Sequence, residues 1–451
     1  MPKTDVLDEK AEATAEPKPQ AAKIEIPKKV LAAEIKLALD ATERAHITIP
    51  ILGTILLRAE AGCLTLVATD LALGYRAKVT ATVTGSGAIC VRAKNLGAIV
   101  PALPDAPVTI DLTEQGVTLT CDRGHFKLPG MSPENFPLIP EGKSTTEITL
   151  PAALLRQEIR CVQFAISQEE SRYTLNGALL LVAKQNLRMV ATDGHRMALI
   201  DAPLPDAADF QILIQNDLLG FLYKLLGQAE AEALVTVRKD EQHLYFELGN
   251  RLVVGRQLTG TFPAYEAVLP KDVPNTVTIE APLFLGALRR VALLCDERTK
   301  GVALTLGSGQ LKLSGASGEY GEATDELMVE THGAEAKIGF TSMYLMDFLS
   351  VAGAAKVRLE MKDENLAARL VICPDPEDKS ALNYQYVIMP MRLLAGGFRK
   401  VSGPLSSHPE GTSVSGEAGW GGQNRRSNSA ERPKRAARSP KRGRGALSLN
   451  R

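Results

Sequence analysis

The chain has 451 residues, 45% hydrophobic and 23% charged, and its formal net charge at pH 7 is zero. This length predicts two to four domains at roughly 100–200 residues each, and the chain has no apolar run of about 18 residues that would span a membrane. The charge is uneven: residues 394–451 carry twelve Lys/Arg against three Asp/Glu, which leaves the rest of the chain acidic. Such a body argues against a protein that grips nucleic acid over a broad basic face.

Residues 1–23 have neither the apolar core of a secretory signal nor the acid-poor composition of a transit peptide, so we expect a disordered, solvated leader. The six cysteines are scattered singly, with no CxxC pair and no nearby histidine at ligand spacing. This pattern predicts reduced thiols and a cytoplasmic location, with no metal site. We expect no cofactor.

One unit recurs along the chain. Gly53, Gly177 and Gly301 are spaced by 124 residues, and each begins an apolar strand, a polar turn and a second alternating strand. An amphipathic helix is predicted before each glycine, at 30–45, 151–167 and 282–298. A shorter helix is predicted after each strand pair, at 92–104, 215–227 and 341–353, followed each time by a strand hairpin.

Pro-rich, polar joints at 134–147 and 268–277 separate the copies. We therefore place three similar domains at 24–145, 146–273 and 274–393, in an α+β fold. Similar spacing arises by chance in α+β proteins, but the matching glycine offsets, the two VATD copies (67–70 and 190–193) and three helix pairs in register argue against that explanation. Serial copies are typical of a solenoid or part of a closed ring, and units this large favour the ring.

Four motifs carry a family resemblance: RYTLNGALL, VATDGHRMA, GTFPAYEAVLP and YVIMPMRL. In this order they resemble the beta subunit of bacterial DNA polymerase III, the DNA sliding clamp, over about residues 24–393. The resemblance implies a DNA-clamp fold in which two head-to-tail chains form a ring, with helices lining the hole and sheets outside. It also implies binding to double-stranded DNA without sequence preference, and to a clamp loader, the replicative polymerase and other proteins that carry clamp-binding motifs. A divergent paralogue dedicated to repair, plasmid or phage replication fits the same sequence.

The resemblance further implies a hydrophobic partner-peptide groove between the second and third domains. In such a groove, flexible methionines repack around different anchors, and arginines at the rim orient polar groups. Plain core is the alternative for the apolar positions, and Glu266 and Ala267 stand where related clamps have an arginine. The matching positions are Arg172, Leu175, Thr192, Gly194, His195, Arg196, Met197, Pro263, Val268, Tyr344, Val387, Ile388, Met389, Pro390, Met391 and Arg392.

Two further sets complete the expected surfaces. We expect several helix cations to face the DNA, with ordinary solvated charges as the alternative: Lys28, Lys29, Lys36, Arg44, Arg156, Arg160, Arg289 and Arg290. By resemblance, ring closure would pair the first domain of one chain with the third domain of the other. The expected interface residues are Arg123, His125, Phe126, Leu128, Leu293, Leu294, Glu319, Glu322, Asp325 and Glu326.

Residues 394–451 extend past the family pattern and are rich in Gly, Ser and Arg, which predicts a disordered basic tail. Such a tail is either a basic arm for nucleic acid, with Trp420 as a stacking residue, or a dispensable extension. A further alternative is that the first residues of this tail fold over the groove and occupy it. A hydrolase built on Asp193 and His195 is the rival function, but no nucleophile motif, P-loop or paired metal ligands accompany them. We therefore expect a non-catalytic processivity subunit.

Overall fold

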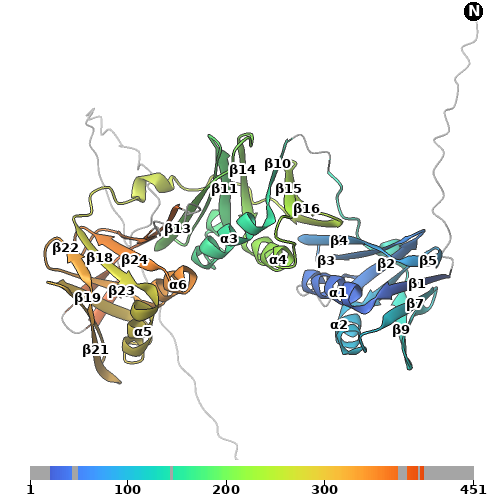
Figure 1. The fold of residues 1–451 in the computed structure, drawn as a ribbon, viewed down its shortest axis with the longest axis horizontal. Coiled ribbons are helices and arrows are strands. Elements are labelled where there is room, and N and C mark those ends of the chain that lie inside the picture. The colour runs from blue at the N-terminus through green and yellow to red at the C-terminus, as the bar shows by residue number, and fades with distance from the viewer. Residues whose placement is uncertain (1–20, 43–48, 143–145, 374–382, 395–396, 401–451) are drawn as a thin grey trace, which may run out of the picture. The chain divides into compact units, whose positions relative to one another are not determined.

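A computed structural model describes residues 21–42, 49–142, 146–373, 383–394 and 397–400, and Figure 1 shows their helices and strands. The described part of the chain contains three pairs of α-helices, as the repeat predicted. The pairs are α1 (Lys28–Thr42) with α2 (Ala93–Ala102), α3 (Ala152–Val162) with α4 (Asn216–Leu226), and α5 (Ala281–Ala292) with α6 (Ser342–Ala352). Short 3-10 turns lie at η1 (Pro50–Gly53), η2 (Pro133–Asn135), η3 (Gln163–Ala165), η4 (Tyr173–Leu175) and η5 (Tyr265–Val268).

The strands form three sheets of antiparallel neighbours. In spatial order, the 13-stranded sheet is β10 (Thr146–Pro151), β15 (Leu234–Lys239), β16 (His243–Leu248), β17 (Arg251–Arg256), β4 (Leu73–Thr80), β3 (Cys63–Thr69), β2 (Thr54–Glu60), β6 (Gly87–Arg92), β9 (Gly124–Met131), β8 (Gly116–Cys121), β7 (Pro107–Thr113), β1 (Ala22–Pro27) and β5 (Thr82–Gly85).

The nine-stranded sheet is β14 (Phe210–Gln215), β11 (Gly177–Ala183), β12 (Asn186–Thr192), β13 (Arg196–Pro203), β26 (Asn383–Ile388), β25 (Ala368–Ile372), β24 (Lys356–Met361), β18 (Asn275–Glu280) and β22 (Glu330–His332). The six-stranded sheet is β21 (Gly321–Met328), β20 (Gln310–Ser317), β19 (Gly301–Gly307), β23 (Ala336–Thr341), β27 (Met391–Leu394) and β28 (Gly397–Lys400).

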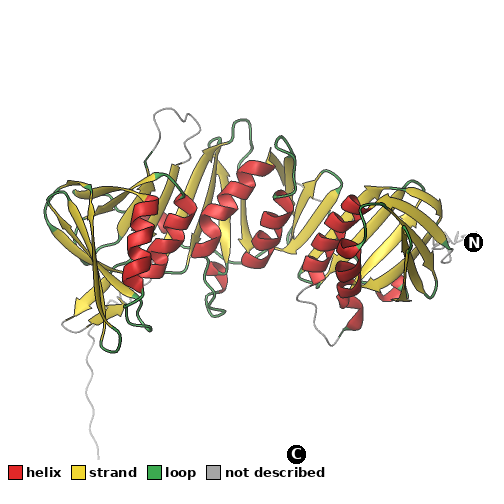
Figure 2. Ribbon diagram, turned by 60° about the horizontal axis from the view of Figure 1, so that its bottom comes forward, coloured by secondary structure: helices red, strands yellow, loops and turns green. Residues whose placement is uncertain are grey.

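Each helix pair packs on strands through one apolar face, and Figure 2 shows the helices lying against the sheets. In α3 the buried side chains include Leu155, Ile159 and Val162, which recur at the three- and four-residue spacing of a helix face. Burying each such side chain contributes about 1.5–3 kcal/mol relative to exposure. The apolar periodicity read from the sequence is therefore the periodicity that holds the helices on the sheets.

Two of the three sheets run across the expected domain boundaries. Strand β17 of the second domain pairs with β4 of the first, and β26 of the third domain pairs with β13 of the second. The first joint also contains a buried ion pair, because Arg251 Nη2 and Nε lie 2.5 and 3.0 Å from Glu34 Oε1, while the Tyr75 hydroxyl donates to the same carboxylate. Each joint is thus a continuous ladder of main-chain hydrogen bonds.

The structure changes the expected ends of the folded region. Strand β1 begins at Ala22, inside the expected leader, because Ala22, Ile24 and Ile26 alternate inward. The expected disordered tail likewise begins too early, since β27 runs to Leu394 and pairs with β28. Residues 401–451 lie outside the described residues. In the described part of the chain, no helix is long and apolar enough to span a membrane.

Candidate functional site

The VATDGHR segment forms a tight turn between β12 and β13. Asp193 Oδ1 accepts hydrogen bonds from the main-chain N–H groups of His195 and Arg196, at 2.9 and 3.0 Å. Thr192 Oγ1 donates to the Arg196 carbonyl and accepts from Gly194 N, whose φ of 86° suits glycine. The aspartate therefore fixes the turn through its side chain, as expected for this residue type in turns.

The first domain repeats this turn. Asp70 Oδ1 accepts from Ala72 N and Leu73 N at 2.9 and 2.7 Å. Leu71, at the position of Gly194, has a φ of 77° and is half exposed. VATD is thus a structural element of the repeat, and only the residues after it distinguish the second copy.

Arg196 lies buried in the joint between the second and third domains, with a relative exposure of 9%. Its Nε is 3.0 Å from Asp193 Oδ2, its Nη1 donates to Asp347 of α6, and its Nη2 donates to the Phe164 carbonyl at 2.7 Å. The guanidinium also stacks over the Tyr344 ring, 4.3 Å from the centroid. Arg196 therefore does not lie at the rim of the groove as expected, because it is buried and its Nε, Nη1 and Nη2 all donate inside the joint.

His195 does not form a catalytic pair with Asp193. The Asp193 carboxylate is used by main-chain donors and by Arg196, whereas the His195 side chain makes no hydrogen bond among the described residues. The His195 main-chain carbonyl accepts from Met389 N at 2.8 Å. Among the described residues, no chain of hydrogen bonds joins the His195 side chain to the Asp193 carboxylate and a nucleophile.

An apolar cluster covers the face of the nine-stranded sheet opposite the helices. Along β13, Met197 and Leu199 point into this cluster while Ala198 and Ile200 point into the main core, as strand alternation requires. We call it the outer cluster. Its buried members are Leu179, Val190, Met197, Leu199, Leu213, Leu258, Phe262, Tyr265 and Val387. Its half-buried members are Leu175, Leu181, Val268, Leu269, Ala367 and Met389.

Five of the expected groove residues lie in the outer cluster. Met197 and Val387 form its floor, while Leu175, Val268 and Met389 are half-buried and reach the surface. They come from β13, β26, η4, η5 and the segment after β26, so both domains contribute. Ile388 belongs instead to the main core, since it points to the helix side of β26.

The remaining expected groove residues differ in exposure. Arg172 is half-buried, with its Nη1 donating to the Asp193 carbonyl at 2.8 Å. Thr192, Pro390 and Met391 are buried, Pro263 is half-buried and Arg392 is exposed.

Sequence reasoning missed several members of the outer cluster. Phe262 and Tyr265 pack edge to face with centroids 6.2 Å apart, and both lie in the GTFPAYEAVLP motif. The aromatic spacing around Pro263 was the available signal. Arg188 was also missed: its Nη1 lies 3.3 Å from the Tyr265 hydroxyl, and its other nitrogens bind Asp201.

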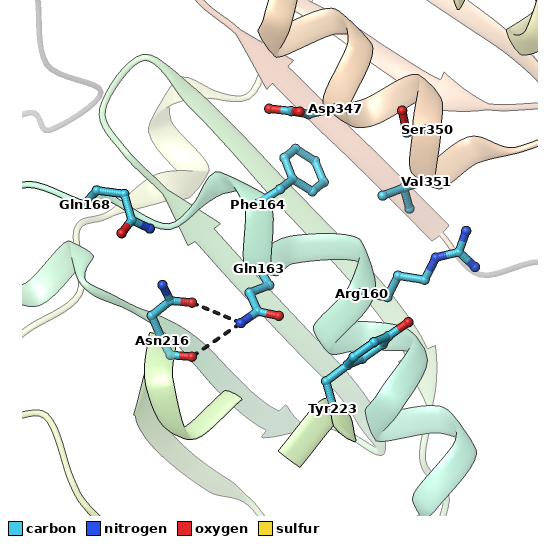
Figure 3. A pocket seen from close by; sticks show the side chains of 9 residues that line it. All are labelled: Arg160, Gln163, Phe164, Gln168, Asn216, Tyr223, Asp347, Ser350 and Val351. Atoms are coloured by element: carbon cyan, nitrogen blue, oxygen red, sulfur yellow. Dashed lines mark hydrogen bonds between the residues drawn. The ribbon is translucent and has the colours of Figure 1, made fainter. Parts of the chain in front are cut away.

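On the helix side, an open hollow of about 560 Å³ lies between α3, α4 and α6. Figure 3 shows its side chains, with Gln163 Nε2 donating to Asn216 Oδ1 and O at 3.1 and 3.3 Å. The lining residues are Arg160, Gln163, Phe164, Gln168, Asn216, Tyr223, Asp347, Ser350 and Val351. Arg160 is exposed and makes no ion pair among the described residues, so it is available to an anion in this hollow.

The other helix cations divide by their contacts. Lys28 Nζ donates to the Leu103 carbonyl at 2.5 Å, and Lys29 pairs with Asp105 at 2.9 Å. Arg156 stacks over Tyr223, 4.5 Å from the ring centroid.

Arg290 pairs with Asp325 of β21 at 2.7 Å. Lys36 and Arg289 are exposed without an ion pair among the described residues, and Arg44 lies outside those residues.

Most of the expected ring-closing residues lie on or next to two strands with free edges, and Leu293 and Leu294 follow α5. Residues 124–129 of β9 pair with β8 on one side, and β6 meets β9 only at Gly130 and Met131. Phe126 is 36% exposed there, whereas Leu128 is buried in its own domain. Arg123, His125 and Lys127 are exposed, so this edge is basic.

The second free edge is acidic. Strand β21 ends the six-stranded sheet, and Glu319 and Glu322 are exposed on or beside it. Asp325 and Glu326 already pair within the chain, the latter with Lys312 at 3.1 Å. Leu293 is 78% exposed at the end of α5 and Leu294 is half-buried.

Comparisons with known proteins identify the family to which this chain belongs. Profiles of the DNA polymerase III beta subunit match in chain order: the N-terminal domain at residues 22–140, the central domain at 149–264 and the C-terminal domain at 266–392. The chain belongs to the DNA polymerase III beta-subunit family.

Known relatives are similar to this chain in sequence and structure over most of its length. A beta sliding clamp of Pseudomonas putida is 32% identical over 372 residues, covering 82% of this chain and 99% of that protein. The beta sliding clamp of Escherichia coli K12 is 30% identical over 349 residues, covering 77% and 93%. A crystal structure of the DnaN sliding clamp of Pseudomonas aeruginosa, bound to griselimycin, superposes with a TM-score of 0.77 at 30% identity and covers 83% of this chain and all of that one. The beta subunit described here is accordingly a sliding clamp, a processivity factor of DNA synthesis.

Proposed function

We propose that two copies of this beta subunit close head to tail into a ring around duplex DNA. The joints within the chain support this, because each is made by one strand from each domain. The first joint pairs β17, the last strand of its hairpin series in the second domain, with β4, which holds the equivalent place after β2 and β3 in the first domain. The strand equivalent to β17 in the first domain is β9, and the strand equivalent to β4 in the third domain is β21. Both have a free edge, and the β9 edge is basic whereas the β21 edge is acidic.

Phe126→Asp tests the ring, since Phe126 is exposed on the free edge of β9. A charge buried between two paired strands is strongly unfavourable, so the variant should sediment as a monomer at micromolar concentration where the parent chain is a dimer. Leu366→Asp, at an exposed position in the turn between β24 and β25, is the matched control. A Phe126→Asp variant that remains dimeric would rule out this closing surface.

We propose that the helix side faces the duplex and holds it by few, exchangeable phosphate contacts. Lys36, Arg160 and Arg289 are exposed without ion pairs among the described residues, whereas Lys29 and Arg290 already pair with carboxylates. Few contacts give weak binding that lets a ring slide.

A closed ring cannot pass over a DNA circle without opening, so the proposal includes a clamp loader. Once loaded, the ring should stay on nicked circular DNA and leave after the circle is cut. Equal release from the circular and the linear form contradicts topological linkage. Replacing Lys36, Arg160 and Arg289 by Ala should speed sliding off linear DNA and flatten the salt dependence of release.

The outer cluster is proposed as the docking groove for the replicative polymerase and other partners. Its floor is apolar and its half-buried side chains come from two domains, which suits short peptides with apolar anchors. Val268→Asp should weaken binding of a Leu/Phe-anchored peptide more than tenfold, measured by fluorescence anisotropy. Unchanged binding would place the groove elsewhere. The proposal assigns the chain no catalytic activity and a cytoplasmic location.

A further inference from the structure

Glu266 lies between two residues of the outer cluster. On η5, Tyr265 is buried and Val268 half-buried in that cluster, whereas the Glu266 side chain is 64% exposed. This short turn thus supplies two apolar contacts and, two positions before Val268, one solvent-facing carboxylate.

The charge of Glu266 is poorly compensated within the chain. Its ion pair among the described residues is with Arg188 Nη1, at 4.0 Å. Arg188 is already held by Asp201 through a two-pronged contact, with Nε at 2.6 Å from Oδ1 and Nη2 at 3.1 Å from Oδ2. Such bidentate pairs are the strong ones, so the Arg188 cation is shared between Asp201 and Glu266, and its contact with Glu266 is the longer of the two.

The other arginines beside the outer cluster cannot supply the missing charge. Arg196 is buried between Asp193 and Asp347. Arg172 lies 2.9 Å from Glu169 and binds the Asp193 carbonyl. Arg392 is exposed on β27 and makes no ion pair with Glu266 among the described residues.

We propose that Glu266 makes this groove select partner segments that carry a lysine or arginine beside their apolar anchor. The inference rests on the proposed docking groove and adds the chemistry of its ligand. An incoming cation would complete the ion pairing at Glu266, while an incoming carboxylate would add a third negative charge next to Asp201 and Glu266.

The test uses the full chain and two sets of fluorescent peptides. Both sets share Leu and Phe anchors, and a single Lys or a single Glu is placed in turn at each position flanking the anchors. We expect the best Lys peptide to bind about twofold to fivefold tighter than its Glu counterpart, the range of one partly exposed ion pair. The difference should shrink as the salt concentration rises, because exposed charges are screened.

Substitutions at Glu266 distinguish a failure of the charge inference from a failure of the proposed docking groove. Glu266→Gln should abolish the Lys preference and Glu266→Lys should invert it, with anchor binding retained in both. Glu60→Lys, on an exposed position of β2 in the first domain, makes the same charge change away from the groove and should leave the preference intact.

Two outcomes overturn these conclusions differently. A Lys preference of equal size in the parent chain and in Glu266→Gln, or no preference at any flanking position, removes the role of Glu266 while the groove stands. If no anchored peptide binds the parent chain and Val268→Asp changes nothing, the proposed groove itself fails.

Discussion

Replacing Glu158 by leucine should stabilise the central domain. Glu158 lies on α3 with no exposed surface, and neither carboxylate oxygen has a hydrogen-bond partner among the described residues. An unpaired buried polar group costs about 1–3 kcal/mol. Leucine is of similar size and suits the apolar face of α3, so Glu158→Leu should recover at least that amount.

The gain should grow with pH. Burial, together with the negative charge of Asp201, holds the pKa of Glu158 well above its ordinary value, so this carboxyl keeps its proton in the folded domain to a higher pH than in the unfolded chain. Above the unfolded pKa of about 4.3, folding must take up a proton, and the parent chain loses about 1.4 kcal/mol of stability per pH unit until the raised pKa is reached. Glu158→Leu lacks this loss.

Urea unfolding between about pH 5 and 8 measures both effects. The midpoint and slope of each urea curve give the free energy of unfolding directly. Glu158→Gln is the control, because an amide keeps the polar group but does not titrate, so its stability should not fall with pH in the same way. The reasoning is refuted if Glu158→Leu is no more stable than the parent chain near pH 8 and the three proteins share one pH profile.

Three further changes probe the joints. Gly194→Ala should cost about 1–3 kcal/mol, because φ there is 86° and the added Cβ would lie 2.5 Å from Arg172 Nη1; an unchanged Tm would contradict this. Leu71→Gly, at the equivalent turn, should leave stability unchanged or raise it by up to about 1 kcal/mol by removing strain, as followed by thermal unfolding; a clear loss would show that Leu71 is unstrained. Arg251→Met should cost about 3–5 kcal/mol by leaving the buried Glu34 carboxylate without its cation, although the Tyr75 hydroxyl still donates to it, and adding Glu34→Gln should restore most of it in the same urea assay. A single variant as stable as the parent chain would show that the ion pair is not needed.

The repeated elements were predictable because their signals are local. Helices α3 and α5 lie within the predicted ranges 151–167 and 282–298, give or take one residue, since apolar spacing and the preceding proline or turn act within a few residues. The repeated glycine marked the same strand in each unit, but the space around this glycine differs between the copies. A Cβ at Gly177 would meet the Ile214 carbonyl at 2.2 Å, whereas nothing lies within 4 Å of one at Gly53.

By itself, the amino-acid sequence determined three copies of one unit, their helix pairs and the turn fixed by Asp193, since each depends on neighbours along the chain. Only the tertiary structure decided which side chains of VATDGHRM reach the surface. Arg196 meets Asp347 across 151 positions of sequence, and Met197 lies beside Val387 on a strand of another domain. Exposure depends on what packs against a residue from far along the chain, and a motif read locally contains no information about that neighbour.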